Sequence, residues 1–108
     1  MIASEMDIRW ITERVIVLCN PDCVYLFGSY AKGTAHKGSD VDLLIVVPST
    51  LPRLHRVKVL KAALSTFPCR FDLLFFTLQE LEDEMNDPFS FVSFILASGR
   101  LVYKKGQN

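Results

Sequence analysis

The sequence has no surplus of charge of either sign and no hydrophobic run that could cross a bilayer. Lysine and arginine together number 12, as do aspartate and glutamate, so the formal net charge is zero. A basic balance would have suggested a nucleic-acid or membrane partner. The longest apolar runs, such as LLIVV, fall far short of the roughly 18 residues that a spanning helix needs. We therefore expect no membrane partner and no direct nucleic-acid binding.

Cysteine is scarce, with three residues at Cys19, Cys23 and Cys69. An odd number of cysteines without a secretory leader does not indicate a disulfide framework. Cys19 and Cys23 also lack the second cysteine pair that would complete a zinc site. We expect three reduced and mostly buried thiols in a cytoplasmic protein.

The chain has neither an internal repeat nor a low-complexity segment. Its 108 residues suffice for one hydrophobic core and are too few for two. Half of the residues are apolar and 22% are charged, which is typical of a globular domain and not of a disordered chain. We predict a single domain over residues 1–108.

Hydrophobic periodicity predicts both helices and strands. Helical spacing follows Ser4 as far as Asn20, and recurs over residues 54–64, 78–85 and 88–98. Short apolar runs predict strands at CVYLF, DVDLLIVV and RFDLLFF, with RLVYK as an edge strand. The run DLLIVV is nearly all apolar, which favours a central strand covered on both faces. The order predicts an α/β or α+β fold, a small mixed sheet with helices packed on it.

Two aspartates, Asp40 and Asp42, stand one residue apart where this central strand begins. Side chains alternate along a strand, so the two carboxylates point to the same face, roughly 6.5–7 Å apart. Carboxylates this close repel unless a proton or a cation lies between them. Closely spaced anionic oxygens suit Mg²⁺. The alternative is that both aspartates cap a turn and face water.

Gly28 and Ser29 end the preceding apolar run. Glycine lets a backbone come close to a ligand, and serine offers a hydroxyl and an N–H group. If SYAKG forms a short helical turn, its free N–H groups favour an anion, and Lys32 lies one turn on, where it could reach a phosphate. A Gly-Ser pair is also common in ordinary turns. Its place before the two aspartates indicates a phosphate site beside a metal site.

The stretch GSYAKGTAHKGSDVD contains Gly28-Ser29, ten further residues and Asp40-Val41-Asp42. It resembles the GSx10DxD signature of the DNA polymerase β-like nucleotidyltransferases, and most closely the minimal, MNT-type members of about this length. The resemblance implies the polymerase β-like nucleotidyltransferase fold over residues 1–108. It also implies a third carboxylate on a later strand, which RFDLLFF supplies as Asp72.

By this resemblance, Asp40, Asp42 and Asp72 would be the catalytic residues and would hold two Mg²⁺ ions. The triphosphate of ATP would lie over Gly28 and Ser29, with Lys32 contributing. The alternative for Asp72 is a plain ion pair with Arg70, two residues away on the same face.

MNT-type proteins resembling this one typically act as antitoxins of helical HEPN ribonucleases. The resemblance therefore implies an ATP-dependent nucleotidyltransferase that moves AMP to a hydroxyl, a tyrosine of a HEPN toxin partner. Two other hypotheses remain open. The chain could neutralise its partner by complex formation without catalysis, or it could be the catalytic subunit of a two-chain transferase acting on a small molecule or RNA.

Three phenylalanines, Phe89, Phe91 and Phe94, lie close together in PFSFVSFIL. Helical spacing of aromatic residues more often fills a core than binds a base. We therefore expect this series to be buried, with part of the apolar surface left for an interface with another subunit.

Overall fold

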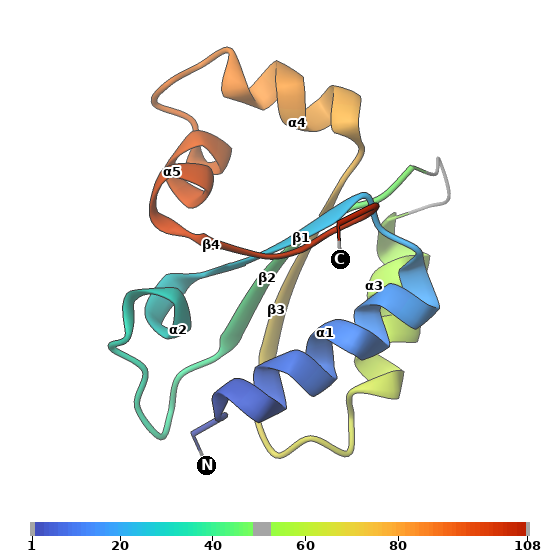
Figure 1. Cartoon of the computed structure of the whole chain (residues 1–108), viewed down its shortest axis with the longest axis vertical. Helices are drawn as coiled ribbons and strands as arrows, with labels where there is room; N and C mark the ends of the chain where they lie inside the picture. The colour runs from blue at the N-terminus through green and yellow to red at the C-terminus, as the bar shows by residue number, and fades with distance from the viewer. Residues whose placement is uncertain (1, 49–52, 108) are drawn as a thin grey trace.

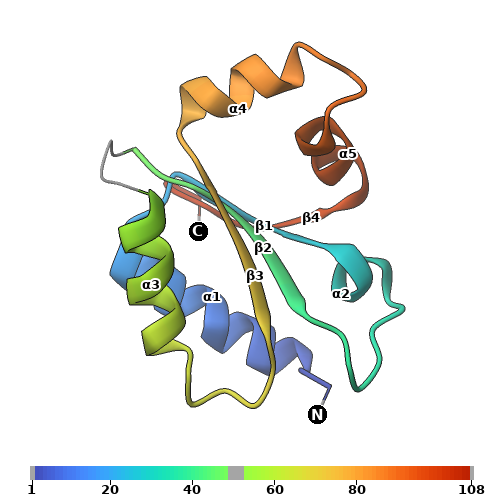
Figure 2. The ribbon, with the colours of Figure 1, turned by 180° about the vertical axis from the view of Figure 1, so that it is seen from behind.

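The computed structural model describes residues 2–48 and 53–107, in which a four-stranded sheet lies between two layers of helices (Figure 1 and Figure 2). The elements, in chain order, are α1 (Glu5–Cys19), β1 (Cys23–Phe27), α2 (Gly28–Lys32), β2 (Val41–Val46), α3 (Arg53–Ala63), β3 (Phe71–Phe76), α4 (Leu78–Met85), α5 (Phe91–Ser98) and β4 (Arg100–Lys104). This order confirms the predicted α/β arrangement and includes the short helical turn α2.

The sheet has the strand order β3-β2-β1-β4. β1 is antiparallel to both β2 and β4, whereas β2 and β3 are parallel. β2 is therefore an inner strand, and Asp42 is its only residue that is not buried. Both the central position of this strand and the edge position of β4 are as predicted.

Helices α1 and α3 cover one face of the sheet. The Ser4 hydroxyl accepts a hydrogen bond from the Asp7 N–H at 3.1 Å, and the Asp7 carboxylate accepts one from the Ser4 N–H at 2.8 Å, so a capping box starts α1. The helix ends at Asn20, which takes the left-handed conformation with φ 45°. Its buried side packs with α3 and with alternate residues of β2, through Ile8, Ile11, Val15, Leu60, Val41, Leu43 and Ile45.

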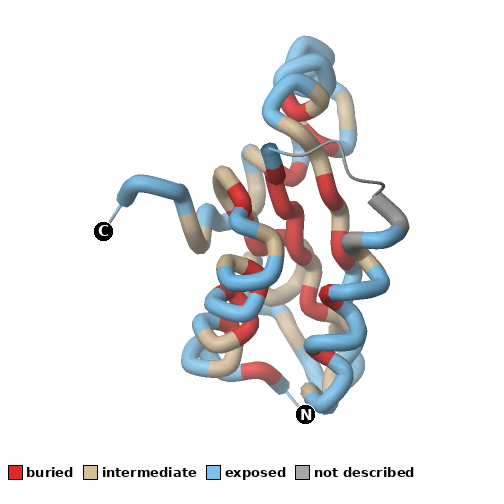
Figure 3. The backbone as a smooth tube through the Cα atoms, turned by 90° about the vertical axis from the view of Figure 1, so that its right-hand side faces the viewer, coloured by how far each residue is buried: buried red, intermediate tan, exposed pale blue. Residues whose placement is uncertain are grey.

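Helices α4 and α5 cover the opposite face. Leu44 and Val46 of β2 point to this side and pack with Leu81 of α4 and with Val92 and Ile95 of α5. Figure 3 shows the buried residues running along the strands, with exposed residues on the outer sides of the helices. Because side chains alternate along a strand, Asp42 shares the α4–α5 face with Leu44 and Val46.

Two predictions about the C-terminal half are wrong. α5 begins at Phe91, not at Pro88, because the Ser90 hydroxyl caps it by accepting a hydrogen bond from the Ser93 N–H. The three phenylalanines of this segment do not fill the core: Phe89, Phe91 and Phe94 are 94%, 57% and 60% exposed.

Two other sequence features can be compared with the structure. Cys19, Cys23 and Cys69 are each partly buried, less than predicted, and no disulfide joins any two of them in the described structure. Within residues 2–48 and 53–107, none of the helices combines the length and the apolar character needed to cross a bilayer.

We expect Leu44→Ala to lower the free energy of unfolding by about 2–5 kcal/mol, because it leaves a cavity in a well-packed layer. Leu44 is 0% exposed, whereas Leu101 on the edge strand is 43% exposed. Leu101→Ala is therefore the matched control and should change stability by only about 0.5 kcal/mol. Urea unfolding of both variants measures the difference, and equal losses would show that α4 and α5 do not cover Leu44.

Candidate active site

Asp42 and Asp72 lie directly beside each other on two parallel strands. In the pairing of β2 with β3, the Cα of Asp42 is the partner of the Cα of Asp72. Both side chains point to the α4–α5 face, since Leu44, Leu74, Val46 and Phe76 follow at the same alternation on that side. Both residues stand near the beginning of their strands, so the two carboxylates meet at one end of the sheet.

The environments of the two carboxylates differ. Asp42 is half-buried and Asp72 is exposed. The pKa of Asp42 is raised from 3.8 to about 6, first by burial and then by the negative charges of Asp72 and Asp40. A proton or a cation at this position would relieve the repulsion among the three carboxylates.

Asp40 precedes β2 and contacts Arg70, which precedes β3. The Arg70 Nε lies 3.0 Å from Oδ1 of Asp40. This buried Oδ1 has an ionic contact with Arg70 but accepts no hydrogen bond from the described residues. Arg70 also donates a hydrogen bond to the Gly38 carbonyl oxygen at 3.2 Å. The sequence alternative was an Arg70–Asp72 pair, and the structure places the guanidinium on Asp40 instead.

The three aspartates are near one another without forming a closed metal site. Over residues 2–48 and 53–107, no three His, Cys, Asp or Glu side chains are gathered so as to hold a metal ion as they stand. The donor set is nevertheless suited to a hard cation, because it consists of carboxylate oxygens, one of them without a hydrogen-bond donor. All three carboxylates could therefore bind one cation only after a movement of their side chains.

Gly28 brings the Gly-Ser turn against this acidic group. Its φ is +72°, in the left-handed region that favours glycine. A Cβ on Gly28 would collide with Oδ2 of Asp42, so the carboxylate occupies space that only glycine leaves open. The two halves of the sequence motif are therefore in direct contact, with Phe27 beside Asp42 in the pairing of β1 with β2.

Ser29 and Lys32 lie on α2, which begins at Gly28. No side chain caps the first turn of this helix. The Ser29 carbonyl oxygen accepts a hydrogen bond from the Thr34 N–H at 2.9 Å. The exposed Lys32 ammonium lies 5.3 Å from the ring centroid of Phe94 on α5. This contact with α5 could not be read from the sequence, because the spacing of the phenylalanines indicated a buried face.

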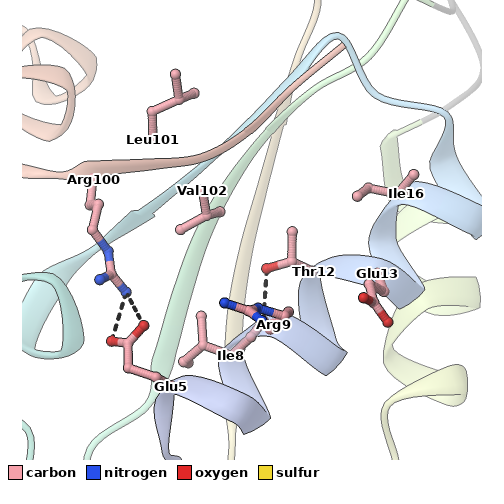
Figure 4. A pocket seen from close by; sticks show the side chains of 9 residues that line it. All are labelled: Glu5, Ile8, Arg9, Thr12, Glu13, Ile16, Arg100, Leu101 and Val102. Atoms are coloured by element: carbon pink, nitrogen blue, oxygen red, sulfur yellow. Dashed lines mark hydrogen bonds and ion pairs between the residues drawn. The ribbon is translucent and has the colours of Figure 1, made fainter. Parts of the chain in front are cut away.

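One hollow of the surface lies away from the acidic group, and another takes in one of its members. The hollow in Figure 4 has a volume of about 380 Å³ and lies between α1 and β4, on the other face of the sheet. At its mouth Arg100 donates hydrogen bonds to both Glu5 oxygens, at 3.1 and 3.3 Å. A second hollow of about 360 Å³ includes Asp40 and Arg70. The hollow beside α1 is lined by charges of both signs, including the Arg100–Glu5 ion pair, whereas the acidic group brings together three carboxylates.

We expect Gly28→Ala and Gly33→Ala to differ, although both positions have nearly the same positive φ, +72° and +74°. Left-handed backbone costs a residue with a Cβ about 1–2 kcal/mol in either place. A Cβ at Gly33 meets nothing within 4 Å, whereas one at Gly28 meets Asp42. Gly28→Ala should therefore lose about 1–3 kcal/mol more, and it alone should shift the carboxyl resonance of Asp42 in NMR spectra. Identical behaviour of the two variants would contradict this contact.

We also expect Asp42 to make stability fall as pH rises from 3.8 to about 6. In that range the folded chain holds a proton that the unfolded chain has released, so raising the pH favours unfolding. Asp42→Asn should remove this slope and be more stable than the wild type at pH 7. NMR titration of the carboxyl carbons should give Asp42 a lower pKa in Asp72→Asn, and no change in Glu82→Gln on the outer face of α4. An unchanged titration in Asp72→Asn would disprove the coupling.

Comparison with known proteins shows the family and the fold of the chain. The family model described as a nucleotidyltransferase domain matches residues 9–102. The protein adenylyltransferase MntA of Shewanella oneidensis is 35% identical over 51 residues, which make up 47% of this chain and 37% of that protein. The matched segment thus spans little more than a third of the length of that relative.

Two solved structures show the same fold. A chain of a toxin–antitoxin complex crystallised with AMP-PNP superposes with a TM-score of 0.61 at 22% identity, over 88% of this chain and 74% of that chain. A chain from the complex of the tri-AMPylated Shewanella oneidensis HEPN toxin with its MNT antitoxin gives a TM-score of 0.50 at 18% identity, over 90% and 72% of the two chains.

The family match includes both strands that hold the acidic pair, and the turn at Gly28. It confirms the resemblance inferred from the Gly-Ser and Asp-Val-Asp motif. The chain therefore belongs to the nucleotidyltransferase domain family.

Proposed function

We propose that residues 1–108 form one Mg²⁺-dependent nucleotidyltransferase domain that moves AMP from ATP to a hydroxyl group of a protein, in the cytoplasm. The observation that carries this proposal is the register of Asp42 with Asp72 against the turn at Gly28. A half-buried carboxylate with a raised pKa, next to two more carboxylates, is a costly arrangement that a bound cation relieves.

Asp40, Asp42 and Asp72 would hold the Mg²⁺ ions, and these three are the proposed catalytic residues. Bound Mg²⁺ supplies charge neutralisation on the transferring phosphate and lowers the pKa of the attacking hydroxyl. The N–H and hydroxyl of Ser29 would bind the terminal phosphates, while Gly28 leaves room for their close approach. Lys32 lies on the same short helix and would add its positive charge.

The reaction forms a bond between the acceptor oxygen and the α-phosphorus of ATP and breaks the bond from that phosphorus to the oxygen bridging to the β-phosphate. Pyrophosphate leaves with the electron pair of the broken bond. The proton of the acceptor hydroxyl goes to a carboxylate, for which we propose Asp72, since it is the exposed member of the pair. The protein forms no covalent intermediate, so positioning and charge neutralisation provide the rate.

We further propose that the acceptor is a tyrosine of a HEPN toxin and that the chain acts as its antitoxin. This rests on likeness to named relatives. One is a protein adenylyltransferase, and one solved complex pairs an MNT antitoxin with a tri-AMPylated HEPN toxin. Because that antitoxin is bound to its toxin in the complex, neutralisation by binding alone remains the alternative hypothesis.

Transfer of label from ATP tests the proposed chemistry. We expect label to reach the partner toxin from ATP labelled at the α-phosphate and not at the γ-phosphate, in the presence of Mg²⁺. Asp42→Asn and Asp72→Asn should each slow transfer by about 100-fold or more, because each removes charge at the reacting phosphate. Asp83→Asn is the matched control, since this exposed aspartate on α4 bonds only to Gln79 in the described structure, and its rate should equal that of the wild type.

Transfer from the γ-phosphate would show a kinase and contradict the mechanism. No transfer from either position, with a stable complex formed by the wild type and by Asp42→Asn alike, would favour neutralisation by binding.

A further inference from the structure

α5 exposes two aromatic rings on the side that faces α2. Phe91 and Phe94 are three residues apart and so lie on one side of the helix. They are 57% and 60% exposed, while Val92 and Ile95 of the same helix are buried against the sheet. Two large apolar side chains left open to solvent, side by side, are a feature of binding surfaces more than of ordinary helix faces.

These two rings border the acidic group. Phe91 contacts Phe27 edge to face, with ring centroids 6.0 Å apart and planes at 89°. Phe27 is the strand partner of Asp42, so Phe91 is one side chain removed from the carboxylate. Phe94 lies under the ammonium of Lys32. Lys32 is one helical turn after Ser29 on α2. In both Figure 1 and Figure 2, α5 and α2 lie on the same side of the molecule, at the same end of β1.

We propose that Phe91 and Phe94 form the face on which the base of the nucleotide packs. This inference rests on the proposed function, because it assumes that the triphosphate lies at Ser29 and Asp42. Aromatic rings beside a phosphate site can take a base by stacking, since every base has a π-face. The rings would bind the base, which is the apolar part of the nucleotide. Lys32 and a cation held by the carboxylates would neutralise the triphosphate.

Lys32 connects the two parts of this site. A contact between an exposed cation and a phenylalanine ring is weaker than a charge-assisted contact with a phosphate. When the triphosphate binds, Lys32 can therefore leave the Phe94 ring for a phosphate oxygen. That movement would leave the face of the Phe94 ring free for the base.

A protein partner is the competing occupant of this surface. The position of the rings favours the base, because Phe91 contacts Phe27, the strand partner of Asp42, and Phe94 contacts Lys32, so both rings adjoin the proposed phosphate site. Stacking also makes a distinct claim about specificity. It tolerates different bases, so the site should bind several nucleoside triphosphates, and purines more tightly than pyrimidines.

Binding of ATP compared with inorganic tripolyphosphate tests the proposal. Titration calorimetry of the full chain, with Ca²⁺ as the divalent cation to slow turnover, would give both dissociation constants. We expect the wild type to bind ATP more tightly than tripolyphosphate. Phe91→Ala and Phe94→Ala should weaken ATP binding roughly 5- to 150-fold without weakening tripolyphosphate binding. Phe91→Tyr keeps a stacking ring and should retain wild-type affinity.

Phe89→Ala is the matched control, because Phe89 is 94% exposed and precedes α5. It should bind both ligands as the wild type does. Unchanged ATP binding in Phe91→Ala and Phe94→Ala, with weaker binding of the toxin, would overturn the inference in favour of a partner surface. Equal loss of ATP and tripolyphosphate would overturn it as well, since it would reflect damage to the phosphate site.

The same titrations separate this inference from the proposed function. A wild type that binds ATP no more tightly than tripolyphosphate would overturn the base-binding face alone. A wild type that binds neither ligand would overturn the proposed function and the inference together.

Discussion

The parallel pairing of β2 with β3 is the constraint on which the candidate site depends. It sets Asp42 beside Asp72, although 29 residues separate them in the chain. The backbone hydrogen bonds between the strands hold the two carboxylates together against their mutual repulsion. A slip of one residue would turn either aspartate to the α1–α3 face and break the pair. The register holds because β2 is buried on both faces, so its apolar residues cannot exchange sides.

Packing on both faces of the sheet therefore offsets the electrostatic cost of the site. Burial and the like charges of two other aspartates raise the pKa of Asp42. An ionised Asp42 therefore causes a loss of stability in the folded chain. The loss is limited because the site lies at the end of the strands, where Asp72 is exposed and Arg70 balances Asp40. Gly28 gives Asp42 its space without moving the strand. The fold thus keeps a locally unfavourable charge arrangement in place, as is common at sites that bind cations.

Sequence reasoning found what depends on local pattern and missed what depends on packing between elements. The apolar run after Asp42 identified an inner strand, and the paired motif identified Gly28 and the acidic residues as neighbours. The contact of Arg70 with Asp40 could not be seen, because Arg70 shares a strand alternation with Asp72 and only the loop geometry decides between them. The exposed rings of α5 were missed for a related reason. The helix is capped by Ser90 and not by Asp87, so it begins later than the sequence predicted. Phe89 therefore lies in the loop before the helix, and only Phe91 and Phe94 lie on it.

The arrangement of exposed and covered sides constrains how an acceptor could approach, if the proposed function holds. On one side of the acidic pair stand α2 and α5, with Lys32 and the rings of Phe91 and Phe94. On the other side stands β3, which is an edge strand and carries the exposed Asp72. A nucleotide that occupies the α2–α5 side leaves the β3 side open. An acceptor hydroxyl arriving there would meet Asp72, the exposed carboxylate of the pair and the one proposed to take its proton.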